Sequence, residues 1–220
     1  MRLFLFLFAL ITLTHGFMSC KSGGGPATFC DTSCLKDTIK FIKEDDPLQP
    51  FVYISAGNCN ADTLIRGYKL GGLTRRVGFP QLVGTNVKIN KSAISCYIKD
   101  TSYAWLAFND CSTGRGFLLK LPFGRTADIS RKSSAINRFD PRFLVDEKLI
   151  CYSDRGNIFV EDMESGKQAM MTFGQKLDID YDAIHEYIDS VRITPTHIWT
   201  KVRFKPDGEW QIKQKTIELK

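Results

Sequence analysis

The sequence is poor in the residue patterns that mark an active site. It contains three histidines in 220 residues, and only His185 and His197 lie beyond the first twenty positions. His185-Glu186 is not followed by the second histidine of a zinc-protease helix, and no Gly-x-Ser-x-Gly turn presents a serine nucleophile. We therefore expect no catalytic residue, no metal and no cofactor, and the sequence favours a role other than catalysis.

A strong charge of one sign is also missing. The 30 lysines and arginines exceed the 24 acidic residues by a net charge of only +6. The basic residues are spread along the chain in short clusters such as Arg75-Arg76, whereas nucleic-acid binders concentrate them in a stripe with interleaved aromatics. We therefore expect no nucleic-acid partner.

One acidic run invites a calcium interpretation. Asp178-x-Asp180-x-Asp182 resembles the opening of an EF-hand loop, in which the sixth residue is glycine and the twelfth is glutamate. This chain has Ala183 and Asp189 at those places. The run is better read as an acidic helix start, because carboxylates favour the positive end of a helix dipole.

Long apolar stretches are absent except at the front. Leu3–Leu13, interrupted only by Thr12, follows the positive charge of Arg2. This arrangement is typical of a secretory signal peptide, and the run is shorter than the roughly 20 residues that a membrane-spanning helix needs. No later segment approaches its length. The sequence therefore predicts an exported protein whose remaining residues are soluble.

Two processing sites compete after this run. A signal peptidase could cut after Gly16, which would free the protein by secretion. Alternatively, Phe17-Met18-Ser19-Cys20 resembles the lipobox of bacterial lipoproteins, and the Ser-Cys-Lys phrase followed by Gly and Ser resembles those of Bacteroidota-type bacteria. The resemblance implies that Cys20 receives diacylglycerol and anchors the chain to a bacterial membrane, facing the periplasm or the cell surface. We expect a signal peptide over 1–19, a flexible tether over 20–28 and one β-rich domain over 29–220.

The cysteine count agrees with this assignment. With Cys20 given to the lipid, an even set remains: Cys30, Cys34, Cys59, Cys96, Cys111 and Cys151. Exported compartments allow disulfides to persist, and six cysteines allow 15 pairings between which the sequence does not choose. Cys96 and Cys151 lie in apolar strands and have the alternative role of small buried hydrophobes. Zinc is disfavoured, since Cys30-Asp-Thr-Ser-Cys34 lacks the common two-residue spacing and has no histidine nearby.

Most of the domain has the pattern of β-hairpins. Four strand–turn–strand units occupy 51–70, 104–121, 149–161 and 198 onward, each with Asn or Asp and Gly in its turn. Apolar strands at 94–98, 143–145 and 191–193 precede three of the units and extend them to meanders. Four other segments have separate predictions: short helices over 31–45 and 178–189, a loop over 126–137, and a bulge near 213–215 in the last strand.

The units begin every 45 to 53 residues, a period typical of propeller blades. The third unit, Tyr152–Lys167, resembles a blade of the TolB or YVTN-type β-propellers. Trp105 and Trp199 lie opposite the apolar face of their strands, as expected for blades packed on both sides. The predicted fold is mostly β, a small four-unit propeller-like meander of antiparallel strands with one or two short helices. A β-sandwich or a single antiparallel sheet is the alternative.

These features favour a lipid-anchored binding or assembly module. Repeated β units without catalytic residues commonly serve as binding surfaces, and the expected partners are the membrane, through the lipid, and an unknown protein or glycan. The alternative function is a secreted enzyme such as a glycan hydrolase, because the 24 acidic residues offer many carboxylate pairs.

Overall fold

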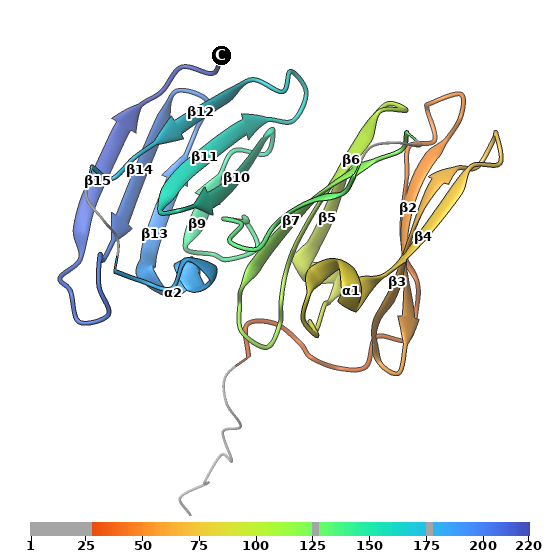
Figure 1. Cartoon of the computed structure of the whole chain (residues 1–220), viewed down its shortest axis with the longest axis horizontal. Coiled ribbons are helices and arrows are strands. Elements are labelled where there is room, and N and C mark those ends of the chain that lie inside the picture. Colours follow the sequence, from red (N-terminus) through yellow and green to blue (C-terminus); the bar gives the residue numbers. More distant parts are fainter. Residues whose placement is uncertain (1–27, 125–127, 175–177) are drawn as a thin grey trace, which may run out of the picture.

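The computed structural model describes residues 28–124, 128–174 and 178–220. Within them the backbone is mostly β and forms four sheets, which we label A to D (Figure 1). Sheet A contains β1 (Ile39–Ile42), β2 (Pro50–Gly57), β3 (Asn60–Tyr68) and β4 (Thr74–Gly78). Sheet B contains β5 (Ile94–Lys99), β6 (Tyr103–Asn109), β7 (Gly116–Pro122) and β8 (Ser130–Lys132). Sheet C contains β10 (Leu149–Asp154), β11 (Asn157–Asp162) and β12 (Gln168–Met171), and sheet D contains β9 (Phe143–Val145), β13 (Ile188–Ile193), β14 (His197–Val202) and β15 (Gln211–Thr216).

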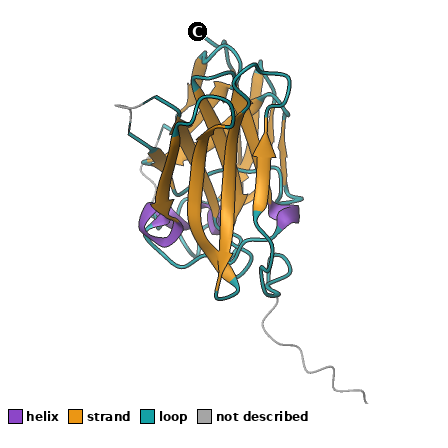
Figure 2. Cartoon of the chain, turned by 90° about the vertical axis from the view of Figure 1, so that its right-hand side faces the viewer, coloured by secondary structure: helices purple, strands orange, loops and turns teal. Residues whose placement is uncertain are grey.

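The helices of the described residues are short. They are α1 (Phe79–Val83), α2 (Ile184–Tyr187) and two 3₁₀ turns, Lys91–Ala93 and Tyr181–Ala183. Figure 2 shows the helices at one end of the strands, with the C-terminus at the other. Among the described residues there is no helix with the length and hydrophobicity that crossing a membrane requires.

Sheets A and B pack face to face as a first sandwich. Their inward side chains form one buried cluster that includes Ile54, Leu64, Leu106 and Phe108, each fully buried. Phe108 stacks on Phe117 of β7, with ring centroids 5.2 Å apart. Alternating apolar residues put one face of each strand into this core.

Sheets C and D pack as a second sandwich. Ile158 and Val160 of sheet C meet Val191, Ile198 and Val202 of sheet D in a separate buried cluster. The two sandwiches follow one another in the order A, B, C, D, from right to left in Figure 1. Sheets A and D lie at opposite ends of this row, and residues 28–124, 128–174 and 178–220 form no closed propeller.

A smaller joint connects the sandwiches between sheets B and C. Its buried apolar residues are Trp105, Leu118, Ala135 and Ile150. Lys120 on sheet B lies 3.4 Å from the buried carboxylate of Glu161 on sheet C. Sheet B is therefore covered on both faces, and the prediction that the Trp105 face of its strand packs against another sheet is confirmed.

The segment that leads from sheet B to sheet C lies between the two sandwiches. The backbone N–H of Ala135 donates to the carbonyl of Gly116, and that of Ile136 donates to the carbonyl of Cys151. A Cβ atom on Gly116 would lie 2.2 Å from the carbonyl oxygen of Ala135, so only glycine allows this approach. Asn137 donates from its amide to the carbonyl of Phe108. These bonds give the joint a fixed backbone connection in addition to its apolar contacts.

All four predicted hairpins are present, as β2–β3, β6–β7, β10–β11 and β14–β15. The third meander was predicted wrongly. Residues 143–145 form β9, which pairs in parallel with β13 of sheet D instead of with β10. The third strand of sheet C is instead β12, which pairs with β11, so the predicted meander with an upstream strand fails at this unit.

The helix predicted over 31–45 is wrong. Ile39–Ile42 is strand β1, in which Ile39 pairs with Ile54 of β2, and residues 28–38 contain no helix. Pairing with a sheet edge here outweighs the helical spacing of the apolar residues, which a short strand also satisfies. The helix over 178–189 is confirmed only in its middle, because β13 already begins at Ile188.

The bulge predicted near 213–215 is also wrong, since β15 pairs with β14 without a register shift. Trp210 and Ile212 are exposed, whereas Ile217 is buried, so simple alternation explains the change of phase. The loop predicted over 126–137 includes the short strand β8, and its residues 126 and 127 lie outside the described residues.

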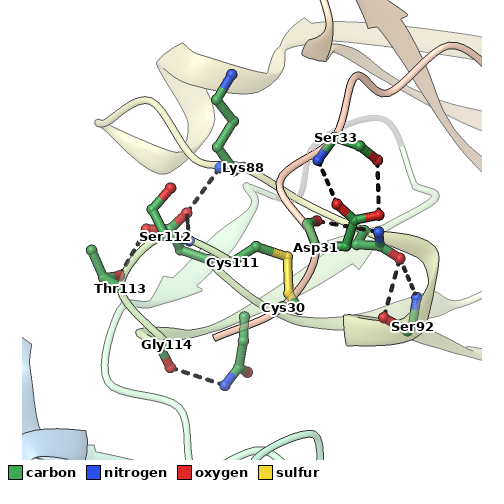
Figure 3. The surroundings of a disulfide bond; sticks show 12 residues. Cys30, Asp31, Ser33, Lys88, Ser92, Cys111, Ser112, Thr113 and Gly114 are labelled. Atoms are coloured by element: carbon green, nitrogen blue, oxygen red, sulfur yellow. Dashed lines mark hydrogen bonds between the residues drawn. A yellow bond between two sulfur atoms is a disulfide. The ribbon is translucent and has the colours of Figure 1, made fainter. Parts of the chain in front are cut away.

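Two disulfides hold the N-terminal segment 28–38 to the first sandwich. Cys30 bonds to Cys111 in the turn between β6 and β7, and Cys34 bonds to Cys59 in the turn between β2 and β3. Figure 3 shows the first of these, beside Asp31, whose carboxylate accepts hydrogen bonds from the backbone and hydroxyl of Ser33. The segment is thereby fixed to turns of both sheets at one end of the sandwich.

Cys96 and Cys151 are free thiols. The pairing of all six cysteines is therefore wrong, and the alternative role as small strand residues holds for these two. Burial raises the pKa of both thiols, so the reactive thiolate is suppressed. Residues 1–27, which include the predicted signal peptide, Cys20 and most of the tether, lie outside the described residues.

Candidate binding face

The outer face of sheet D differs from the sheet faces inside the row because no other sheet of the described chain packs on it. Phe143, Val191 and Ile198 point into the second sandwich, so the intervening residues of the same strands point outward. The pairing register places four of them in one row across the sheet: Leu144 on β9, Arg192 on β13, Trp199 on β14 and Gln214 on β15. We call these four residues, together with His197, Ser190, Lys201, Trp210 and Ile212, the sheet D face.

The sheet D face exposes large apolar side chains. Leu144 is 55% exposed, Ile212 62% and Trp210 40%. They are three of the seven large apolar side chains that are exposed among the described residues. Trp199 is half-buried in the middle of the face. Clustering of exposed apolar residues on one face is a mark of interaction surfaces, whereas single exposed residues are ordinary.

A hollow of about 470 Å³ lies over the row. Leu144, Arg192, His197 and Trp199 line it, with Arg142 and Ser190 beside them. The hollow between sheets B and C, next to Trp105, measures only about 50 Å³. Ligand pockets commonly measure 300 to 1,000 Å³, so the hollow on sheet D has the size to receive one or two side chains of a partner.

The cations around this hollow differ in their partners. The guanidinium of Arg142 bonds to the buried carboxylate of Asp140, and Lys201 lies 3.2 Å from Asp189. A hydrogen bond from Lys201 lowers the pKa of Asp189, so the Asp189 carboxylate is ionised at neutral pH. Arg192 is exposed, and its side chain makes no hydrogen bond or ion pair with the described residues.

The face combines a cation that is open to solvent with apolar side chains on either side of it. Such a surface suits a partner that brings acidic and apolar groups together. Among the described residues, no group of three histidine, cysteine or acidic side chains is placed to hold a metal ion. The acidic run Asp178, Asp180 and Asp182 precedes α2, and Asp178 and Asp180 are exposed.

His185 of α2 lies at the contact between the two sandwiches rather than on the sheet D face. It is 8% exposed, and its Nε2 has no hydrogen-bond partner among the described residues. Burial lowers the pKa of His185 more than Glu186 and a hydrogen bond to the backbone of Thr113 raise it. The nearby charges of Arg142 and Arg115 add to the lowering.

We expect acid to destabilise the protein through His185. Its pKa is lower in the folded state than in the unfolded chain, so the unfolded chain binds the extra proton as the pH falls below about 6.5, and folding stability decreases until the pH passes the folded pKa. His185→Gln should flatten the fall in Tm between pH 7.5 and pH 5. His197→Gln, on the sheet D face, is the matched control. An unchanged slope in the His185 variant would contradict this assignment.

The structure places the predicted site residues in three groups. Cys20 lies outside the described residues, four of the other cysteines form the two disulfides, and Cys96 and Cys151 are free. From the sequence, Trp199 and Trp210 could line a ligand face, but core positions were favoured for both, so the sheet D face was not predicted. The sequence signal that indicates this face is Ile212. It is an apolar residue on the outward-facing side of β15, whose other outward residues are polar.

Comparisons with known proteins add no relative. No protein-family model, no curated protein sequence and no solved structure matches this chain.

Proposed function

We propose that the chain is an exported binding or assembly module, anchored by a lipid on Cys20 and docking a partner on the sheet D face. The two disulfides favour an oxidising environment outside the cytoplasm, and the lipobox-like sequence before Cys20 supports the anchor. The observation that carries the docking function is the hollow lined by Leu144, Arg192 and Trp199, on a sheet face that also exposes Trp210 and Ile212.

The position of the N-terminal segment gives the docking face an orientation. Phe29 donates its backbone N–H to the carbonyl of Cys111 at the end of the first sandwich where the β6–β7 turn lies. The strands run away from that end, and the outer face of sheet D looks across the strand direction (Figure 1).

The test places a photo-crosslinking amino acid at Gln214, in the outward row of sheet D, in cells that make the full chain. The matched control carries it at Arg76, an exposed position of sheet A. We expect a discrete adduct from position 214 and none from position 76. Adducts at both positions, or at neither, would refute the proposed docking face.

The same strains test the anchor. Labelled palmitate should enter the wild-type protein and be absent from Cys20→Ala, and the adduct at position 214 should weaken in that variant because the protein no longer concentrates at the membrane. Equal labelling of wild type and Cys20→Ala would remove the lipid from the proposal and leave a freely secreted module.

A further inference from the structure

We infer that the hollow on sheet D recognises a carboxylate flanked by apolar side chains, as presented by an acidic segment of a partner protein. This inference rests on the proposed docking function and specifies its chemistry. Arg192 is the residue that would bind the carboxylate, and Leu144 and Trp199 are the residues that would contact the apolar neighbours.

Arg192 has the surroundings of a carboxylate-binding residue. It stands between Leu144 and Trp199 in the pairing register, and directly opposed residues on one face of a sheet lie about 4.5–5.5 Å apart at Cβ. A carboxylate on its guanidinium would therefore sit between two apolar walls, where water is partly excluded and a charge-assisted bond is stronger. The planar guanidinium can bind both oxygens.

The other cations of the hollow are less suited to this role. Asp140, with a side chain only 3% exposed, already neutralises Arg142, and Asp189 neutralises Lys201. An incoming carboxylate would have to compete with these internal partners. Arg192 has no competitor within the described chain, and the imidazole of His197 lies on the same hollow as a further polar group.

The apolar part of the face favours a protein over an anionic glycan. Leu144 and Ile212 are aliphatic and more than half exposed, and aliphatic side chains gain little against the hydroxyl groups of a sugar. A polyanionic glycan would also be expected to use several open cations in a row, because each charge contact adds to its affinity. The exposed Arg192 between the apolar Leu144 and Trp199 instead suits alternating acidic and apolar side chains of a polypeptide.

The test measures binding of the full chain to three soluble polymers, by calorimetry and by the change in tryptophan fluorescence. Trp199 and Trp210 lie on the sheet D face and should report on binding there. The probes are a random copolymer of glutamate and tyrosine, poly-glutamate and polygalacturonate. We expect the copolymer to bind at least about tenfold more tightly than either other polymer, because only it supplies both a carboxylate and an apolar group.

Arg192→Gln should weaken copolymer binding by about ten- to a hundredfold, the range for a lost charged hydrogen bond. Arg192→Lys should recover part of the affinity, since a lysine keeps the charge but loses the two-point geometry. Arg76→Gln on sheet A is the matched control and should bind as the wild type does. Unchanged Tm values would confirm that the variants fold.

Three results would overturn the inference. Polygalacturonate binding as tightly, with the same dependence on Arg192, would assign the hollow to a glycan. Absence of copolymer binding would refute the carboxylate–apolar chemistry. If Trp199→Ala abolishes copolymer binding while Arg192→Gln binds as tightly as the wild type, the docking function stands and the carboxylate site is refuted. The crosslink at position 214 reports on the docking function independently of all three.

Discussion

Replacing Cys30 and Cys111 by serine should lower the free energy of unfolding by about 4.5 kcal/mol, on a chain-entropy estimate for the 81 residues that separate them. The bond connects a segment without regular structure to the β6–β7 turn, so its loss releases both the N-terminal segment and a long loop of the unfolded chain. Denaturant unfolding of the purified protein measures the change.

The second disulfide supplies the comparison. Cys34 and Cys59 are 25 residues apart, and the same estimate gives about 3.5 kcal/mol for their replacement by serine. Both of these cysteines are exposed, whereas Cys111 is fully buried, so a mild reductant should open the Cys34–Cys59 bond first. A larger loss from the Cys34 and Cys59 double variant than from the Cys30 and Cys111 double variant would refute this ranking.

Phe108→Ala should destabilise the first sandwich by about 3–5 kcal/mol while leaving the second almost unaffected. Phe108 is fully buried and packs on Phe79 of α1, 5.4 Å away between ring centroids, and on Phe117 of β7. Among the described residues, the joint between the sandwiches has four buried apolar residues with five partly buried ones packed against them. This is far less apolar contact than either core provides, so we expect the joint to transmit only part of the lost stability. Hydrogen exchange followed by mass spectrometry should show faster exchange in sheets A and B alone.

Ile198→Ala is the mirror experiment in the second sandwich. Ile198 is fully buried in the separate core of sheets C and D, and its truncation should cost about 2–5 kcal/mol and accelerate exchange in those sheets. If either variant accelerates exchange equally in all four sheets, the protein unfolds as one unit and the joint is stronger than its contacts indicate.

The sequence predicted the hairpins well because their signals are local. In β10–β11, for example, the turn Asp154–Asn157 contains Arg155 and Gly156 at positive φ, and apolar alternation on either side defines the strands. The partner of β9 could not be predicted in this way. In its parallel pairing with β13, Phe143 lies opposite Val191. The two strands are not joined by a short turn, so no local sequence signal predicts that they pair.

The open face of sheet D was not predicted, for a different reason. Trp105 and Trp199 have the same local pattern, each a tryptophan on the strand face opposite apolar residues that point into a core. Sheet C covers Trp105, which is 6% exposed, while Trp199 lies on the open sheet D face. Which sheet lies next to a strand is decided by tertiary packing, so the two residues could be separated only in the folded molecule.

The parallel pairing of β9 sets an order of assembly as the chain emerges during export. Every strand of sheets A and B pairs with its neighbour in the sequence, so the first sandwich can complete itself from contacts made over short distances. In sheet D, Phe143–Val145 stays unpaired until Val191–Ile193 is available to pair with it. All strands of sheet C lie between these two segments in the sequence. The second sandwich therefore closes last and more slowly, and until then its apolar strands are open to self-association.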